Sequence, residues 1–337
     1  MTRARTTTQA AGSNAPGPAS PRWLVTERAD FWIISAGAGA LLAVAALVLL
    51  GLGDRELSAA DLILGELHLG ATYDAIARRR LWRRMPLGVL VVPLAILVGT
   101  YVLLLNEGAL LVTTTIVYFG AWHRGRQNFG IARYYHRQAG GPVSPLHRWL
   151  LATSFYLPML AAVVYYASTA HDHEGDAFHG LSLAPDLLWW LVSVAVASVM
   201  VYLVWTVGRG VHPGERWLVV ANALGFGSAY VVGAWTASFV LTLAIHHELQ
   251  YLVFTYAVAR RAEAPTGPDA APEIRRLARF AVWPVLGLAS WVICKAFALE
   301  ALEPFLTAGL LGHYWLDGRI WTARARRLGP ELAPIAT

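Results

Sequence analysis

The chain has 337 residues, of which 56% are hydrophobic and only 14% are charged. With a mean hydropathy of +0.48, it is too apolar for a soluble protein of this length, and we expect a multi-pass protein of the cell (inner) membrane. The net charge of +6 is also found in nucleic-acid-binding proteins, but a basic excess is expected in the cytoplasmic loops of a membrane protein. We therefore expect membrane lipids, and no nucleic acid, as partners.

Cysteine usage restricts the chemistry of any metal site. Cys294 is the only cysteine of the chain, which excludes an intrachain disulfide, an iron–sulfur cluster and a thiolate zinc site. Any metal must therefore be held by imidazole and carboxylate groups.

Hydropathy predicts an all-α fold, a polytopic bundle of about ten transmembrane helices, each roughly 20 residues long as a bilayer core requires. We place these spans at residues 31–53, 57–78, 86–106, 108–131, 149–169, 186–207, 217–236, 238–260, 279–299 and 303–323. Residues 1–30 are rich in Thr, Ala, Pro and Arg and are predicted to form a disordered cytoplasmic tail. The transmembrane domain is then 31–323, followed by a cytoplasmic C-terminal tail at 324–337.

Arginines alternate with acidic or neutral loops along the chain, as the positive-inside rule requires of successive loops. They follow the second, fourth, sixth, eighth and tenth predicted spans, whereas the loop at 171–176 contains five acidic or histidine side chains and no Lys or Arg. This alternation predicts that both termini lie in the cytoplasm.

Ionisable and amide side chains interrupt four of the predicted spans, where such groups are costly and usually functional. The set is Glu66, His68, Asp74, His123, Gln127, His246, His247, Glu248, Gln250, His313 and Asp317. Three pairs are four residues apart and so share a helix face, namely His123 with Gln127, His246 with Gln250 and His313 with Asp317. We predict that the four helices converge on a metal.

The depths of these side chains agree with a single site. Counted from the predicted outer ends, His68, His246, His247 and His313 lie about eight to eleven residues in, or roughly 12–17 Å by helical rise. His123 and Asp74 lie about fifteen to seventeen residues in, within one or two turns of that level. The sequence therefore predicts one cluster near the middle of the membrane.

Imidazoles and carboxylates without thiolates suit iron, copper or zinc. We assign the metal ligands as Glu66, His68, His123, His246, His247, His313 and Asp317. Gln127 and Gln250 are expected to orient these ligands, in the way that groups around a metal site commonly do. Asp74, as a relay of protons from the cytoplasm, and Glu248, as a further ligand or a partner of an arginine, are the candidate catalytic residues. One or two iron ions are the cofactor that we favour.

Two stretches carry a local resemblance to known proteins. The sequences Ala244-Ile245-His246-His247-Glu248 and Leu311-Gly312-His313-Tyr314-Trp315-Leu316-Asp317 resemble the histidine motifs of integral-membrane non-haem iron enzymes, of the desaturase, hydroxylase or carotenoid-dioxygenase type. In the desaturase motifs the spaced partner is a second His, whereas here it is Gln or Asp. The resemblance implies an oxidoreductase that uses dioxygen on a lipophilic substrate (an acyl lipid, an isoprenoid or a quinone), with an electron donor as a candidate partner.

Other functions fit the same polar residues. Two histidines on facing helices could be the axial ligands of a haem in a membrane electron carrier, the His and Asp cluster could serve a proton or metal-ion transporter, and a zinc hydrolase could use the same ligands. The remaining histidines are interpreted as loop or packing residues, and this set comprises His136, His147, His171, His173, His179 and His212.

Overall fold

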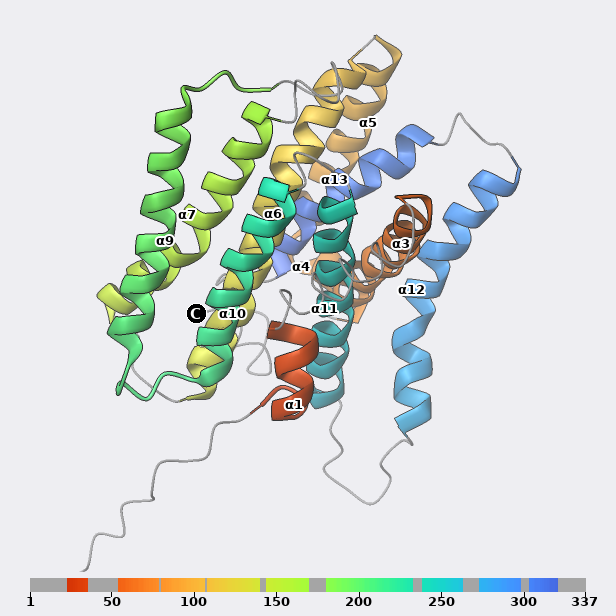
Figure 1. Cartoon of the computed structure of the whole chain (residues 1–337). Coiled ribbons are helices and arrows are strands. Elements are labelled where there is room, and N and C mark those ends of the chain that lie inside the picture. The colour runs from red at the N-terminus through yellow and green to blue at the C-terminus, as the bar shows by residue number, and fades with distance from the viewer. Residues whose placement is uncertain are drawn as a thin grey trace, which may run out of the picture.

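The computed structural model describes residues 23–35, 54–78, 80–106, 108–139, 144–169, 180–232, 238–262, 273–297 and 303–320. Within these ranges every regular element is helical (Figure 1). The elements are α1 (Glu27–Ala29), η1 (Asp30–Ser35), α3 (Asp54–Arg78), α4 (Leu81–Arg84), η2 (Leu87–Val91), α5 (Val92–Leu105), α6 (Ala109–Gln138), α7 (Pro145–Thr169), α9 (Pro185–Thr206), α10 (Pro213–Phe226), η3 (Gly227–Val232), α11 (Ser238–Ala262), α12 (Glu273–Ala296) and α13 (Glu303–Ile320), where η marks a π-helical stretch. The all-helical prediction is confirmed.

Three helical segments are long and apolar enough to cross a membrane, namely Leu87–Leu105, Pro145–Thr169 and Pro185–Thr206. The first and the last of these expose apolar side chains four residues apart, such as Leu94 and Val98 on α5 and Met200 and Val204 on α9. Wide apolar faces of this kind are unusual on the surface of a soluble protein and are expected to face lipid. The number of crossings and the side on which the termini lie stay predictions.

Most predicted boundaries are close to those of the helices, but two differ. Helix α6 continues to Gln138 instead of ending at 131. Residues 23–30, assigned to the tail, are folded: the Asp30 carboxylate accepts hydrogen bonds from the backbone N–H of Val25 (2.9 Å) and the hydroxyl of Tyr135 (2.8 Å). Helical structure therefore begins before the predicted first span. Residues 1–22 of the predicted tail, residues 36–53 of the first predicted span, the end of the last predicted span and the C-terminal tail (321–337) lie outside the described ranges.

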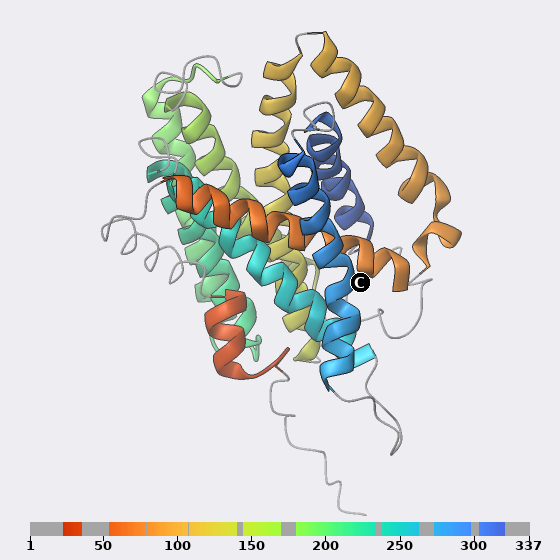
Figure 2. The ribbon, with the colours of Figure 1, turned by 90° about the vertical axis from the view of Figure 1, so that its right-hand side faces the viewer.

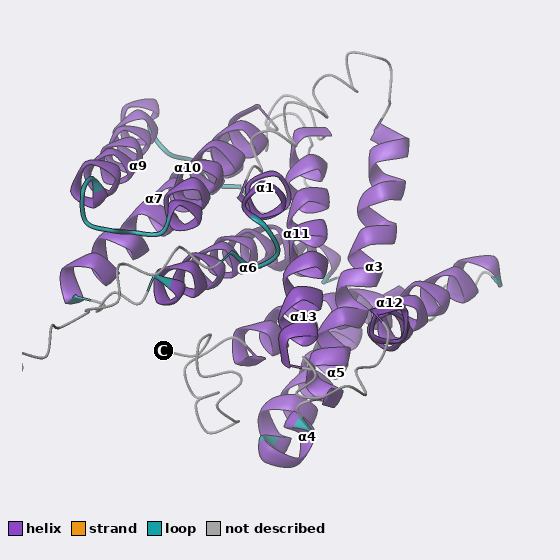
Figure 3. Cartoon of the chain, turned by 90° about the horizontal axis from the view of Figure 1, so that it is seen from below, coloured by secondary structure: helices purple, strands orange, loops and turns teal. Residues whose placement is uncertain are grey.

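Helix α6 joins two groups of helices (Figure 1). On one side it packs against α7 and α10, with α9 behind α7; on the other it packs against α13 and α5. Helix α3 runs across α11 and α12 and does not lie parallel to them (Figure 2), and the view from below shows the two groups side by side (Figure 3). Because α3, α6, α11 and α13 all border the same interior, side chains from distant parts of the sequence can meet there.

Two glycines allow the backbones of α3 and α12 to touch. A Cβ at Gly287 of α12 would lie 2.6 Å from the carbonyl oxygen of Glu66, and a Cβ at Gly70 of α3 would lie 2.6 Å from the backbone nitrogen of Pro284. No side chain fits at such distances. Small residues at helix crossings are a common way to bring membrane helices together.

We expect Gly287→Ala to lower the free energy of unfolding by about 1–3 kcal/mol, because the added methyl group must push α12 away from α3. The matched control is Gly99→Ala in α5, where the new Cβ would have no neighbour within 4 Å; it should be neutral or stabilising by up to about 1 kcal/mol. Thermal unfolding of both variants in detergent measures the difference. Equal melting temperatures would show that the two helices do not touch at Gly287.

Candidate metal centre

Four imidazoles from four helices meet in the interior, as the sequence predicted. His68 of α3, His123 of α6, His247 of α11 and His313 of α13 are all buried. Their ring centroids lie 4.4 Å apart for His68 and His313, 4.9 Å for His123 and His313, and 5.0 Å for His247 with both His68 and His123. We call these four residues the histidine cluster.

The carboxylate of Asp317 completes the site. Its Oδ2 atom lies 3.7 Å from Nε2 of His123, 3.7 Å from Nε2 of His313 and 3.9 Å from Nε2 of His68. One ligand atom from each of these four residues lies within 4.8 Å of all the others. A single metal ion can therefore be reached by three imidazoles and one carboxylate.

Two hydroxyl groups hold Asp317 and His313 in place. Tyr251 donates a hydrogen bond to Oδ1 of Asp317 (2.6 Å), and Thr72 donates to the same oxygen (2.9 Å). Because the Thr72 proton is used in this way, its oxygen must accept from Nδ1 of His313, 2.8 Å away. His313 is thus held as the tautomer with its proton on Nδ1, which leaves the Nε2 lone pair directed at the cluster.

The nitrogen atoms of the cluster fit a cation. With His313 protonated on Nδ1, Nε2 of His68 donates a 2.7 Å hydrogen bond to Nε2 of His313, and Nδ1 of His68 is left without a partner among the described residues. A proton shift to Nδ1 of His68 would free both Nε2 lone pairs for an ion. Nε2 of His123 is buried and has no hydrogen-bond partner among the described residues. A buried imidazole nitrogen without a partner is costly in a structural network, whereas a metal ion among the three Nε2 atoms would satisfy all of them.

We expect Thr72→Val to weaken metal binding roughly 10–100-fold, the usual effect of removing a group that orients a ligand. Valine keeps the shape of threonine but leaves Nδ1 of His313 and Oδ1 of Asp317 without the hydroxyl. Thr72→Ser keeps the hydroxyl and should bind metal as the natural chain does. Competition with a metal-chelating dye measures both affinities, and an unchanged affinity in the valine variant would remove Thr72 from the site.

The structure separates His246 from the other predicted ligands. His246 is buried, but it bonds to the backbone of Ile33 in η1, and Gln250, one turn further on, donates to the Ile34 carbonyl. His246 and Gln250 therefore hold η1 against α11. Successive residues of a helix point about 100° apart, and of the two adjacent histidines it is His247 that contacts the rings of the cluster. The assignment of His246 as a metal ligand stays a prediction that this geometry does not support.

The predicted carboxylates other than Asp317 also lie outside the group of ligand atoms. Glu248 shares a hydrogen bond with Asp61 and lies near the guanidinium of Arg124. Glu66 is half-buried beside them, in the same cavity lining. Glu66 is not among the grouped ligand atoms, so its role as a ligand stays a prediction. Glu248 has a carboxyl partner as well as the arginine neighbour that the sequence analysis considered.

The two glutamines and Asp74 have other partners. Gln127 donates to Oε1 of Gln250 (3.1 Å) and to the backbone carbonyl of His247 (3.3 Å). It thus supports the backbone beneath His247 and does not bond an imidazole. Asp74 accepts two hydrogen bonds from Nε of Arg78 (2.6 and 2.8 Å) and lines neither cavity beside the cluster. The predicted proton relay through Asp74 stays a prediction.

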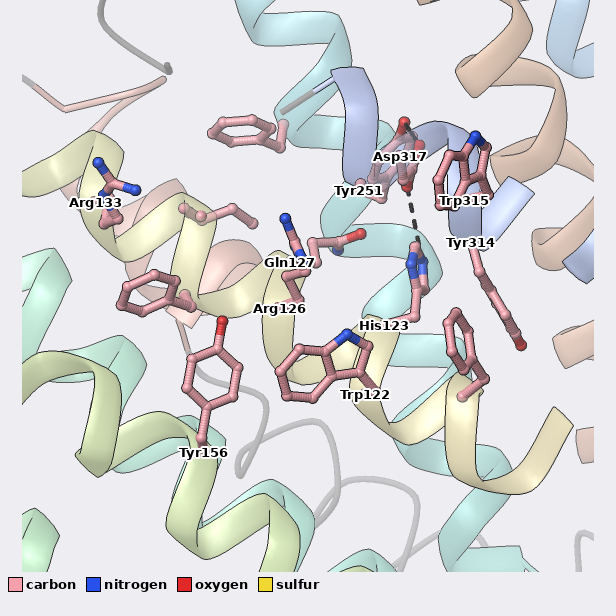
Figure 4. Close-up of a pocket in the computed structure, with 16 residues that line it drawn as sticks. Trp122, His123, Arg126, Gln127, Arg133, Tyr156, Tyr251, Tyr314, Trp315 and Asp317 are labelled. Atoms are coloured by element: carbon pink, nitrogen blue, oxygen red, sulfur yellow. Dashed lines mark hydrogen bonds and ion pairs between the residues drawn. The ribbon is translucent and has the colours of Figure 1, made fainter. Parts of the chain in front are cut away.

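Two cavities adjoin the cluster. The first, about 660 Å³, is lined mainly by aromatic side chains, with His123 and Asp317 at one end and Arg126 and Arg133 further along α6 (Figure 4). The second, about 580 Å³, is lined by all four histidines and by a polar group. That polar group comprises Asp61, Glu66, Arg124, Glu248 and Tyr314. The cluster thus lies between an aromatic chamber and an acidic one.

Sequence reasoning missed Thr72, Tyr251, Asp61 and Arg124. Thr72 follows His68 by four residues, and Tyr251 follows His247 by four, so both share a helix face with a cluster member. That spacing could have found them. Asp61 lies seven residues before His68 and so shares a helix face with it, whereas no spacing of this kind distinguishes Arg124 from the other arginines near the end of the fourth predicted span.

In its described residues the protein is all-helical, and three of its helical segments are long and apolar enough to span a membrane. It carries a buried group of histidine and carboxylate side chains that could hold a metal ion. Comparison with models of protein families, with curated proteins and with solved structures finds no match to this chain. The function must therefore be inferred from the site itself.

Proposed function

We propose that the protein is an integral-membrane metalloenzyme, a non-haem iron oxidoreductase that acts on a lipophilic substrate with dioxygen. One observation carries the proposal: a group of metal-ligating side chains lies at the end of a large aromatic cavity. The group consists of His68, His123, His313 and Asp317, and one ligand atom from each lies within 4.8 Å of the others. His247, in ring contact with His68 and His123, is a fourth imidazole for the same ion or for a second one.

The donor set is compatible with iron, and the proposed reaction with dioxygen is the reason for choosing iron over zinc. Imidazole and carboxylate ligands suit iron, copper and zinc, and soft copper(I) sites prefer sulfur. Iron bound there would supply the activation of dioxygen. The chain's own residues bind and orient the ion: Thr72 and Tyr251 hold Asp317, and Thr72 fixes the tautomer of His313.

The aromatic cavity suits a long apolar substrate. Its lining residues on α6 run from Phe119 to Arg133. This stretch of helix is about 21 Å long by helical rise. Trp122, Tyr156 and Tyr314 lie along this path, and Figure 4 shows Arg133 at the end away from Asp317. An elongated molecule with its reacting carbons at Asp317 and an acidic group near Arg126 or Arg133 would fit this cavity.

The acidic chamber is suited to the movement of protons. A hydrogen bond between the carboxyl groups of Asp61 and Glu248 requires that one of them carries a proton. Both groups line the cavity that the four histidines also line. We assign proton delivery to this pair, with Glu248 as the candidate catalytic residue, and no longer to Asp74.

Dioxygen is the oxidant in each version of the reaction. Cleavage of a C=C bond into two carbonyl groups consumes one dioxygen and needs no other electrons. Hydroxylation of a C–H bond, or formation of a C=C bond, needs two further electrons and two protons, with water as the other product. An external electron donor is therefore a required partner for hydroxylation or desaturation alone.

The membrane location is part of the proposal. The exposed apolar faces of α5 and α9 support it, and the alternation of arginine-rich loops supports about ten spans with both termini in the cytoplasm of a cell (inner) membrane. Both dioxygen and a lipophilic substrate partition into lipid, so a site at this depth would receive them directly.

The test uses the iron-loaded full chain in nanodiscs, with extracted membrane lipids, isoprenoids and long-chain acids as substrates and with isotopically labelled dioxygen. We expect label in a lipid product, or a product that has lost two hydrogens when a chemical reductant is added. Mass spectrometry detects both. Iron bound to the chain without any dioxygen-dependent change in these lipids would contradict the proposal.

Transport of protons or metal ions is the second candidate. The observation that favours it is the acidic chamber, in which Asp61, Glu66 and Glu248 surround Arg124 beside the histidines. Flux of protons or of Fe²⁺ into liposomes that carry the full chain would favour this function. An axially ligated haem is less compatible with the geometry, because its two imidazoles must stand on opposite faces of the macrocycle, whereas here four rings contact one another.

A further inference from the structure

A second group of ligating side chains lies near the far end of α6. His136 of α6, His147 of α7 and Glu215 of α10 are all buried; we call them the Glu215 cluster. His136 follows His123 by thirteen residues on the same helix, which places it about 20 Å further along by helical rise. The Glu215 cluster therefore belongs to neither cavity of the first site.

The carboxylate of Glu215 is the centre of this group. Its Oε2 lies 3.0 Å from Nδ1 of His136, and its Oε1 lies 2.7 Å from Nε2 of His147 and accepts a 2.6 Å hydrogen bond from Tyr202. Each oxygen of this buried carboxylate thus faces one imidazole nitrogen.

The two imidazoles are poorly explained by hydrogen bonding alone. Their rings lie 4.2 Å apart. Nε2 of His136 has no hydrogen-bond partner in the described part of the chain, although this side chain is only 9% exposed. One ligand atom from each of the three residues lies within 4.8 Å of the other two.

Space for further ligands adjoins the group. A cavity of about 270 Å³ is lined by His136, His147, Ser144 and Arg209 among others. Trp205, which also lines the cavity, holds the guanidinium of Arg209: the guanidinium carbon lies 4.8 Å from the Trp205 ring centroid, and Nη1 donates to the Trp205 carbonyl. The cavity is large enough for water molecules.

We infer that His136, His147 and Glu215 bind a divalent transition-metal ion of the zinc type, with water in the remaining positions. Two imidazoles, one carboxylate and an open position are the ligand set of many zinc sites and of non-haem iron(II) sites. Tyr202 would orient the carboxylate from behind. This site is independent of the proposed oxidoreductase function and would join α6, α7 and α10 at one end of the bundle.

The test is a metal titration of the full chain, purified in detergent without a histidine tag and stripped of metal. Binding of Co²⁺ is measured by its visible absorption bands, and binding of Zn²⁺ is measured by elemental analysis. We expect two classes of site in the natural chain. Glu215→Gln and His147→Gln should each remove one equivalent, His313→Ala should remove the other, and Glu215→Gln combined with His313→Ala should remove both. Circular dichroism and size-exclusion elution confirm that each variant is folded.

The matched control is His212→Ala, which removes a buried histidine that accepts from the Gly214 backbone and stacks on Tyr135 outside the group; it should keep both equivalents. Full metal content in both folded variants Glu215→Gln and His147→Gln would overturn the second site and leave the first untouched. If instead His313→Ala keeps every equivalent while Glu215→Gln loses one, the first site fails and the second stands.

Discussion

His313→Ala is expected to abolish metal binding at the histidine cluster and with it any oxidation of lipid. Both ring nitrogens of His313 have partners in the site: its Nε2 lies 2.7 Å from Nε2 of His68 and 3.7 Å from Asp317, and its Nδ1 is held by Thr72. Removing one of four ligands from a buried site leaves the ion undercoordinated where water is scarce. Elemental analysis of the purified variant should show one metal equivalent fewer than the natural chain.

The matched control for this loss is His246→Ala. His246 is buried to a similar extent and precedes His247 directly, but it bonds to η1 and not to the cluster. We expect it to keep its metal, with at most a loss of stability from the released η1 segment. Loss of metal in His246→Ala together with retention in His313→Ala would mean that the wrong histidines have been assigned.

Asp317→Asn is expected to lower metal affinity by at least about 100-fold, beyond the effect of a group that merely orients a ligand. The substitution keeps the size of the side chain and its contacts with Thr72 and Tyr251, but it removes the only charge among the four grouped ligands. A divalent ion would then be surrounded by neutral imidazoles in a buried site, which is electrostatically costly. Affinity is measured by competition with a chelating dye.

Asp74→Asn is the control for the change from carboxylate to amide. Asp74 is also buried on a helix of the site, but its partner is Arg78. This variant should be less stable, because Arg78 loses its ion pair, and should bind metal with unchanged affinity. Equal losses of affinity in Asp317→Asn and Asp74→Asn would show that the effect is general destabilisation and that Asp317 is not a ligand.

The sequence predicted much of the main site because a polar residue in an apolar helix is conspicuous. His68, His123, His247 and His313 each stand in an otherwise apolar or weakly polar segment, and the i, i+4 spacing correctly paired His313 with Asp317. The common depth along the helices was enough to predict that they meet. The same spacing identified Gln127 and Gln250, which the structure shows bonded to each other.

Sequence alone could not decide which of two adjacent histidines faces the cluster. His246 and His247 differ by one residue, and the choice depends on where α3 and η1 lie against α11. The same limit applies to Glu66 and Glu248, whose position beside Asp61 and Arg124 depends on how α3 crosses α11 (Figure 2). Helix orientation is set by packing between distant segments, which hydropathy does not report.

The Glu215 cluster was missed for a different reason. The predicted fourth span ended at 131, so His136 was placed in a basic exit segment, whereas α6 continues to Gln138. His147 and Glu215 each lie near the start of a helix, next to sequence that reads as a polar loop. A histidine or glutamate in such a segment is normally solvated, and only the three-dimensional structure shows that these three are buried together.

The most direct test of the central claim is X-ray absorption at the metal edge of the iron-loaded chain that carries Glu215→Gln, so that only the histidine cluster contributes. We expect three or four imidazole nitrogens and at least one oxygen at about 2.0–2.2 Å, distances typical of such ligands, with the outer-shell scattering that imidazole rings give. A shell of oxygen alone, or the pattern of a porphyrin, would contradict a metal centre built from His68, His123, His313 and Asp317.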